Sequence, residues 1–337
     1  MGKCNFTGCK NEALYSSELC WHHVSDEEEY KKTIETLLTK QTSFKSANLT
    51  KVNLSGLDFT NIDLEGANLA RADLREAKLF NSNLENAELL GANLAGADLT
   101  GANLQKSDLT RSSLRSARLW HANLSGANLV EADLAFSDLW NANLSGVRLW
   151  RTNLTDAVSI TKKSFLLKNN KYSTGCRIDE KGILSSEESY RDLKKYFIAN
   201  GRYDDASWAS FREKTMERLL LKKKRNIAYL PSLIMDLLCG YGEKPHRIIL
   251  SSLFVILFYA AMYYLLSAVT YASCRTYEMI PGDYIYYSII TFTTVGYGDF
   301  IPKAVPLFRF TAASEAFIGA FMIGLFILTL ARKYSAR

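Results

Sequence analysis

The most regular hydrophobic pattern in the chain is an apolar residue at every fifth position. The series runs from Phe44 to Leu154 without a gap, and its 23 members are all Leu or Phe. A small or aliphatic residue, such as Ala47 or Ala92, lies two positions before each member, and Asn or Asp usually lies between the two. A period of five matches neither the 3.6-residue period of a helix nor the 2-residue period of a strand, so it predicts a repeat structure.

This A-(D/N)-L-x-x pattern resembles the pentapeptide-repeat family. The resemblance implies that residues 42–157 fold as a right-handed quadrilateral β-helix in which four pentapeptides form each coil. It also implies that the leucines fill the axis, that the small residues fit the corners and that the other positions face water. The 23 units then make between five and six coils, about 25 Å long at a strand spacing of about 4.8 Å.

Outward residues twenty positions apart should stack on one face of such a helix. One column contains Phe80, Trp120, Trp140 and Ile160, and another contains Leu90, Val130 and Trp150. An exposed apolar stripe often marks a docking surface, so the Trp120/Trp140 face is a candidate site for a partner. The alternative is that the chain after Thr155 folds back and covers this stripe.

The charge of the repeat segment argues against mimicry of DNA, which some acidic pentapeptide proteins perform. Residues 41–157 contain 13 Asp or Glu and 11 Lys or Arg, so the segment is nearly neutral. The net charge of +6 for the whole chain is explained by basic residues that flank the apolar segments described next. We therefore expect no nucleic-acid partner.

Two apolar segments are long enough to cross a membrane, which takes roughly 20 residues. Residues 248–270 contain no charge, whereas residues 307–331 include Arg309 and Glu315. We predict a membrane-spanning helix for each segment. Between them lies a loop of mixed charge, and basic residues precede the first segment and follow the second: Arg218, Lys222, Lys223, Lys224, Arg225, Lys244, Arg247, Arg332, Lys333 and Arg337.

The excess of Lys and Arg marks the cytoplasmic side. We therefore expect a multi-pass protein of the cell membrane with both termini in the cytoplasm. The run Lys222–Arg225 can bind anionic lipid head groups, at about 1 kcal/mol per charge, or can simply enforce this topology. Residues 228–241 are apolar but too short to span, and they predict an interfacial helix. The alternative is a packing helix of the cytoplasmic part.

Between the two predicted spans lies the sequence T-V-G-Y-G, formed by Thr294, Val295, Gly296, Tyr297 and Gly298. The two glycines can adopt backbone conformations that a side chain would forbid. The motif and its flanking spans resemble the two-transmembrane potassium channels of the ion channel 2 family. The resemblance implies a homotetramer in which residues 284–299 form a pore helix and a filter strand, whose carbonyls bind the permeant K⁺ in place of water.

The same resemblance suggests which residues support the filter. Some relatives have an acid four residues before the filter threonine, but Ile290 occupies that position here. We therefore expect Tyr287 to be the partner of Asp299, and Asp283 to cap the pore helix.

In the second span, Gly319 lies where many channels have a hinge glycine, and Gly324 is a second small residue. Close helix packing is the alternative role for either glycine. Glu315 lies one turn before Gly319, and intramembrane acids usually face protein. We expect Glu315 to pack toward the pore helix or a neighbouring subunit and to support the filter by hydrogen bonding Thr or Tyr hydroxyls, such as those of Thr291 or Tyr287. The alternative is that it reaches water near Arg309.

The N-terminal segment, residues 1–26, contains the pattern Cys4-x₄-Cys9-x₁₀-Cys20-x₂-His23. Three cysteines and a histidine suit a tetrahedral zinc site, and a reducing cytosol disfavours disulfides. The pattern resembles the Cys-Cys-Cys-His knuckle found before other repeat domains. Four protein ligands would leave no open position, which makes the expected site structural. His22 is the competitor of His23, and the alternative is that the cysteines bind no metal.

Residues 186–225 show helical spacing of apolar residues with a break at Asn200-Gly201, and they predict a helical hairpin that resembles a tetratricopeptide-like unit. Residues 158–185 are polar and mixed, and they predict a linker or a segment that caps the repeats. The fold class is therefore mixed and multidomain: a β-helix, a helical hairpin and a tetrameric two-span pore.

The sequence predicts a potassium-selective channel subunit with a cytoplasmic repeat domain for regulation or docking. The alternatives are a poorly selective cation channel and a membrane-tethered scaffold that binds partners through its repeats. We expect no enzyme, because the chain lacks a Ser/His/Asp set, a phosphate-binding loop and an open metal site.

Overall fold

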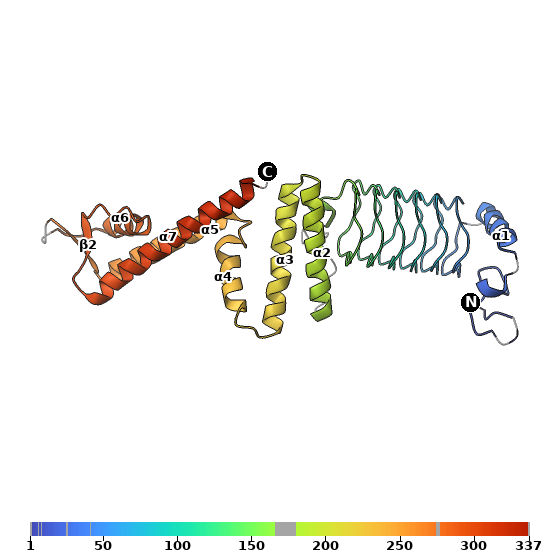
Figure 1. The fold of residues 1–337 in the computed structure, drawn as a ribbon, viewed down its shortest axis with the longest axis horizontal. Helices are drawn as coiled ribbons and strands as arrows, with labels where there is room; N and C mark the ends of the chain where they lie inside the picture. The colour runs from blue at the N-terminus through green and yellow to red at the C-terminus, as the bar shows by residue number, and fades with distance from the viewer. Residues whose placement is uncertain are drawn as a thin grey trace. The chain divides into compact units, whose positions relative to one another are not determined.

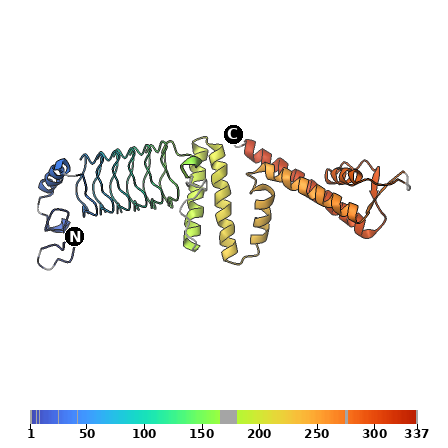
Figure 2. The same cartoon turned by 180° about the vertical axis from the view of Figure 1, so that it is seen from behind.

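The computed structural model describes residues 2–5, 7, 9–24, 26–40, 42–165, 180–273 and 277–335. They form two compact units, Met1–Lys223 and Lys224–Arg337. The first unit contains the repeats with helices at both of their ends, and the second contains the two long apolar helices (Figures 1 and 2).

The N-terminal end of the first unit contains the short helix η1 (Trp21–His23) and the helix α1 (Glu27–Lys40). Helix α1 was not predicted from the sequence, although its start carries the usual signals of a helix N-terminus. Asp26 accepts a hydrogen bond from the Glu29 backbone N–H at 2.9 Å, and acidic residues fill the first turn. Tyr30 and Ile34 of α1 are buried in the same core as the first repeats.

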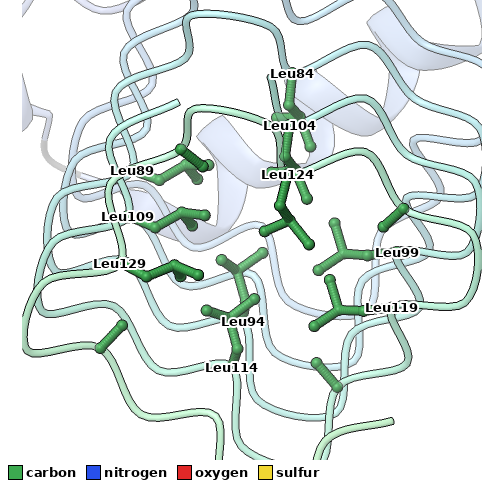
Figure 3. Close-up of a cluster of buried hydrophobic side chains, with 14 of the residues drawn as sticks. Leu84, Leu89, Leu94, Leu99, Leu104, Leu109, Leu114, Leu119, Leu124 and Leu129 are labelled. Carbon is green, nitrogen blue, oxygen red and sulfur yellow. The ribbon is translucent and has the colours of Figure 1, made fainter. Parts of the chain in front are cut away.

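In the repeats, parallel bridges join residues that are twenty positions apart. The bridges run from Ser43↔Asp63 to Asp138↔Val158. Twenty residues are four pentapeptides, so one coil contains four of the apolar positions. Figure 3 shows the result, in which leucines from successive coils stack, for example Leu84, Leu104 and Leu124 in one column. These leucines are fully buried.

Each pentapeptide also contains a tight turn that explains its polar positions. In one unit the Ala67 N–H donates to the Leu64 carbonyl at 3.0 Å, and the third residue of that turn, Gly66, has φ +64°. The Oδ1 of Asn68, just before the next leucine, accepts the N–H of Ala70 at 3.1 Å. Glycine and asparagine tolerate positive φ, and Asn or Asp side chains satisfy turn N–H groups, so the repeat sequence fits the turn.

The C-terminal end of the coils is covered by η2 (Lys162–Phe165) and by the hairpin of α2 (Glu180–Ala199) and α3 (Tyr203–Lys223). Gly201, with φ +66°, lies in the turn between the two helices. The ring of Trp208 packs on Phe165 and Tyr190, with centroids 5.5 and 5.7 Å apart. The Tyr196 hydroxyl donates to the Ala157 carbonyl at 2.7 Å, which ties α2 to the last coil. Residues 166–179 of the predicted linker lie outside the described residues.

The hairpin reaches one residue of the second predicted outward column, whereas Leu90 of that column stays 41% exposed. The Trp150 indole N–H donates to Glu188 of α2, so the folded-back chain covers that tryptophan. Trp120 and Trp140 remain 38% and 54% exposed, and their rings meet edge to face at 6.2 Å. The placement of Ile160 in the outward column was wrong. Ile160 is 1% exposed because the chain leaves the coil ladder after Val158 and turns inward.

The second unit contains α4 (Tyr229–Cys239), α5 (Pro245–Leu265), β1 (Val269–Tyr271), α6 (Pro281–Phe292), β2 (Phe300–Pro302) and α7 (Pro306–Ser335). By length and composition, Pro245–Leu265 and Pro306–Ala331 are candidate membrane spans. The first helix ends earlier than predicted, because Val269–Tyr271 pairs antiparallel with Phe300–Pro302. This ribbon joins the two ends of the segment that contains α6 and the T-V-G-Y-G motif.

Helix α4 packs with the apolar helices. Its buried Cys239 lies in a cluster with Ile248 of α5, Phe292 of α6 and Met322 of α7. Asp236 forms an ion pair with Arg247 at 3.1 Å. The residues Leu230, Ile234 and Leu237, spaced by four and three, are more than half exposed. The helix is therefore amphipathic, with one face on α5 and α7 and the other uncovered within the chain.

The buried leucine stack predicts that Leu109→Ala destabilises the repeats by about 2–5 kcal/mol, because it removes side-chain contacts and leaves a cavity. Leu90→Ala is the matched control, since Leu90 is 41% exposed whereas Leu109 is fully buried. Urea unfolding followed by the fluorescence of the repeat tryptophans measures the difference. Equal shifts of the unfolding midpoint for both variants would contradict the buried stack.

Candidate functional site

The T-V-G-Y-G segment follows directly from the end of α6. The helix ends at Phe292, and Thr293 is its C-cap. Positive φ angles then alternate along the strand, at Thr294 (+58°), Gly296 (+53°) and Gly298 (+78°). Two of these three positions are glycines, for which the left-handed region costs little. The alternation turns successive peptide units so that neighbouring carbonyls can face the same side.

The hydrogen bonds of this segment leave its carbonyls free. The N–H groups of Val295 and Gly296 both donate to the Ile290 carbonyl, at 3.0 and 3.2 Å. Within the described part of the chain, the carbonyl oxygens from Thr294 to Gly298 accept no hydrogen bond. Backbone carbonyls are normally paired, and a row of free ones can coordinate a cation.

The sequence predicts that Tyr287 pairs with Asp299, and this pairing is wrong. The Asp299 carboxylate is hydrogen bonded by Tyr286, not by Tyr287. Tyr287 is buried instead, and its ring packs edge to face on Tyr263 at 5.2 Å. The two tyrosines are neighbours on a helix, so they point about 100° apart. Of these two tyrosines, Tyr286 is the one that faces Phe300, next to Asp299.

Helix α6 also begins earlier than predicted. Pro281 is its first residue, and Ile280 is the N-cap. Asp283 is therefore the third helical residue, and its Oδ2 accepts the Ile280 backbone N–H at 2.9 Å. This is the reciprocal bond of a capping box, and it gives Asp283 a capping role from inside the helix.

Glu315 faces the pore helix, as predicted, but with other partners. Its side chain is fully buried. The Tyr263 hydroxyl of α5 donates to Oε2 at 2.7 Å, and Ser288 of α6 contacts Oε1. The expected bonds to Thr291 and Tyr287 do not form, because Ser288 and not those residues lies on the face of α6 that meets α7. The alternative, in which Glu315 reaches water near Arg309, is excluded because its side chain is fully buried.

Gly319 lies one turn after Glu315 and at a close approach of two helices. A Cβ at this position would overlap the backbone of Phe292, the last residue of α6. A Cβ at Gly324 would meet no atom of the chain within 4 Å. The geometry at Gly319 favours the alternative of close packing, and its role as a hinge remains a prediction.

At the N-terminal end, the ligand atoms of Cys4, Cys9, Cys20 and His23 all lie within 4.8 Å of one another. The Sγ atoms of Cys4 and Cys20 are each 3.4 Å from Nδ1 of His23. The Sγ atoms of Cys9 and Cys20 are 3.7 Å apart. His22 is not part of this cluster. Four soft donors in such a group could hold a metal ion.

The surroundings of the cluster fix its ligands. The Cys20 backbone N–H donates to Sγ of Cys4 at 3.3 Å, and the Asn11 amide reaches Sγ of Cys20 at 3.8 Å. A backbone hydrogen bond from Asn11 lowers the pKa of the Cys9 thiol, but burial and the neighbouring thiols leave that pKa above its usual value. A bound cation would reverse this effect, because coordinated thiols are deprotonated.

The N-terminal cluster is anchored to the repeats. The Asn48 amide donates to the Ala13 carbonyl at 2.9 Å, and the Tyr15 N–H donates to the Asn48 carbonyl at 2.8 Å. His22 lies beside Lys51 of the first coil, with Nε2 and Nζ 3.3 Å apart. The fold therefore uses the two adjacent histidines differently, and only His23 faces the cysteines.

Comparison with protein families finds two matches. Residues 251–336 match the family described as ion channel. Residues 47–86, 77–115, 107–151 and 132–158 match the family described as pentapeptide repeats (8 copies). Among curated proteins, none matches the chain.

Similar solved structures are pentapeptide repeat proteins. One from the Arabidopsis thaliana thylakoid lumen is 29% identical over 28% of this chain and 67% of its own, with a TM-score of 0.28. One from Nostoc is 31% identical over 31% of this chain and 78% of its own, with a TM-score of 0.24. A third, from Nostoc and involved in heterocyst differentiation regulation, is 26% identical over 39% of this chain and 76% of its own, with a TM-score of 0.18.

The contact at Gly319 predicts that Gly319→Ala destabilises the helical unit by about 1–3 kcal/mol, because the added methyl group forces α7 away from α6. Gly324→Ala is the control, and it should be neutral or slightly stabilising because alanine favours a helix. Thermal unfolding of the assembled protein in detergent measures both. A stable Gly319→Ala variant would show that the close approach to Phe292 is not required.

Proposed function

The chain joins pentapeptide repeats to an ion-channel domain, and we propose that it is the pore-forming subunit of a potassium-selective channel that assembles as a homotetramer. The permeant ion is K⁺, and the cage that selects it consists of the backbone carbonyls from Thr294 to Gly298. The single observation that carries this proposal is the row of free carbonyls on a strand with alternating positive φ.

The chemistry of the cage follows from its oxygens. A cation that enters the filter loses its water, and carbonyl oxygens at suitable spacing replace that water. The C-terminal end of α6 points its partial negative charge toward the start of the filter, which favours a cation there. The Thr294 hydroxyl donates to the Thr293 carbonyl at 2.7 Å, so its oxygen lone pairs are available at the same end.

Assembly into a tetramer is supported by what a single chain leaves exposed. Val295 and Tyr297 of the filter strand are 53% and 73% exposed. Two spans cannot enclose a pore, and identical subunits usually assemble with closed symmetry. Four copies around one axis would back each filter strand with the pore helices of its neighbours. Tyr286 and Asp299 hold the outer end of the strand, while Tyr287 and Glu315 hold the scaffold behind it.

The membrane placement has the termini in the cytoplasm and the filter facing outward, in a multi-pass protein of the cell membrane. The basic residues near the start of α5 and near the end of α7 support this orientation. The exposed apolar face of α4, with Leu230, Ile234 and Leu237, suits the membrane interface. The run Lys222–Arg225 precedes this helix and would contact anionic lipid head groups. Gly319 is the position at which α7 would bend during gating.

The repeat domain is a right-handed four-sided β-helix in this proposal, and it serves regulation or docking. The exposed Trp120/Trp140 face is its candidate contact surface. The N-terminal cluster binds structural zinc through Cys4, Cys9, Cys20 and His23. Tetrahedral zinc with bonds of about 2.3 Å to sulfur places sulfurs about 3.8 Å apart, close to the 3.7 Å between Cys9 and Cys20.

Ion selectivity tests the proposal directly. In bilayers that contain the purified protein, the reversal potential should follow the K⁺ gradient, and Ba²⁺ should block the current. Gly298→Ala should abolish selective current, because alanine is strained at φ +78°. Gly324→Ala is the control and should conduct. Equal permeability of Na⁺ and K⁺ in the unmodified protein would favour a poorly selective cation channel.

Metal analysis tests the zinc site independently of the pore. Protein purified without chelator should contain about one zinc ion per chain, and Cys9→Ser should lose most of it, because the site needs all four ligands. His22→Ala should keep the metal. Potassium current should survive Cys9→Ser. Metal-free protein at full cysteine reduction would disprove the site.

A further inference from the structure

Glu315 is a buried acid that lies between hydroxyl groups of two neighbouring helices. Its side chain is 0% exposed within a single chain. The groups that face it are the Tyr263 hydroxyl from α5 and the Ser288 hydroxyl from α6. Tyr287, the nearest other titratable residue of α6, packs on the ring of Tyr263. Across the described residues, Glu315 forms no ion pair with Lys, Arg or His.

The single hydroxyl proton of Ser288 limits the protonation state of Glu315. The Ser288 oxygen is 2.8 Å from the Ile256 carbonyl oxygen of α5 and also contacts Oε1 of Glu315. Two oxygens this close need a proton between them. The Ile256 carbonyl has no proton and a serine has one, so the serine proton lies toward Ile256. The proton between Ser288 and Glu315 must then come from Glu315.

Burial leads to the same conclusion. An ionised carboxylate held away from water without a cation loses several kcal/mol of solvation. A neutral carboxylic acid avoids that loss, and its two oxygens match the partners present. Its hydroxyl donates to Ser288, and its other oxygen accepts from Tyr263 at 2.7 Å. Every proton in the network then has one donor and one acceptor.

We propose that Glu315 is held as a neutral carboxylic acid and that its proton is the link that positions α6, and hence the filter strand, against α5 and α7. The chain of bonds runs from Tyr263 through Glu315 and Ser288 to Ile256, so it joins three helices. Its Ser288 lies about one turn before Phe292, the last residue of α6. The effect on ion flow rests on the proposed function, but the protonation state does not.

Loss of this proton would break the network. A carboxylate has no hydrogen to donate, so Ser288 would have to turn its own proton from Ile256 to Glu315, and the contact between α5 and α6 would be lost. A group that holds a proton in the folded protein and releases it on unfolding makes the fold less stable as pH rises. Alkaline conditions should therefore loosen the filter scaffold.

Infrared difference spectroscopy of the assembled protein tests the protonation directly. The unmodified protein should show the carbonyl band of a protonated carboxylic acid, shifted in D₂O, and Glu315→Gln should lose it. The glutamine amide can donate to Ser288 and accept from Tyr263, so this variant should retain its melting temperature. It should also lose the decrease of that temperature that accompanies a rise of pH above the ordinary range of a glutamate. Absence of the band in the unmodified protein would overturn the proposal.

Tyr259→Phe is the matched control. Tyr259 donates to Ser314 of α7 at 2.9 Å, one turn from Tyr263, and does not touch Glu315. This variant also removes a tyrosine hydroxyl between α5 and α7, but it should keep the acid band and the decrease in stability with rising pH. Ser288→Ala should weaken that decrease, because it removes the acceptor of the hydrogen bond that stabilises the neutral form of Glu315. A decrease with rising pH that persists in Glu315→Gln would assign it to another group.

Conduction separates this proposal from the proposed function. If the protein shows the acid band but carries no K⁺ current, the neutral acid stands and the channel function fails. If K⁺ current is present and falls at alkaline pH in the unmodified protein but not in Glu315→Gln, both stand. If the current is present and its pH dependence is the same in both proteins, the positioning role of the proton is refuted.

Discussion

The structure depends on the requirement that each backbone carbonyl finds a partner. In the repeats this requirement is met between coils, where the N–H of one residue bonds a carbonyl nineteen positions later, as in Leu109 to Asn128 at 2.8 Å. The carbonyls from Thr294 to Gly298 accept no hydrogen bond from the described residues. The repeats therefore pair their own carbonyls, whereas these oxygens can accept a cation or water.

Both regions contain residues with positive φ at a regular interval along the backbone, but the interval differs between them. In the repeats it occurs once in each pentapeptide, as at Gly66 and Arg71, and turns the chain toward the next side of the coil. In the filter it occurs at every second residue, from Thr294 to Gly298. A spacing of five turns the chain, while a spacing of two keeps it extended and rotates its peptide units.

The parts predicted correctly from the sequence are those with a local signal. The pentapeptide period and the T-V-G-Y-G motif each depend on residues close in sequence, and the family matches confirm both resemblances. The missed helix α1 and the early start of α6 are local errors, whereas the errors in side-chain partners concern contacts between distant segments. Ser288 and Tyr263 are 27 and 52 positions from Glu315, and no period connects them. Which of Tyr286 and Tyr287 reaches Asp299 likewise depends on how α6 is rotated about its axis. Packing against the neighbouring helices sets that rotation.

The twenty-residue coil has a consequence for how such a domain can change its length during evolution. Gain or loss of one pentapeptide preserves the leucine stack, because every unit carries the same core residue. It also rotates everything that follows by a quarter turn around the axis. The bond from Tyr196 to Ala157 fixes the hairpin to the last coil, so the hairpin would turn as well. Only changes by whole coils leave its direction unaltered, and viable homologues should therefore differ in steps of twenty residues.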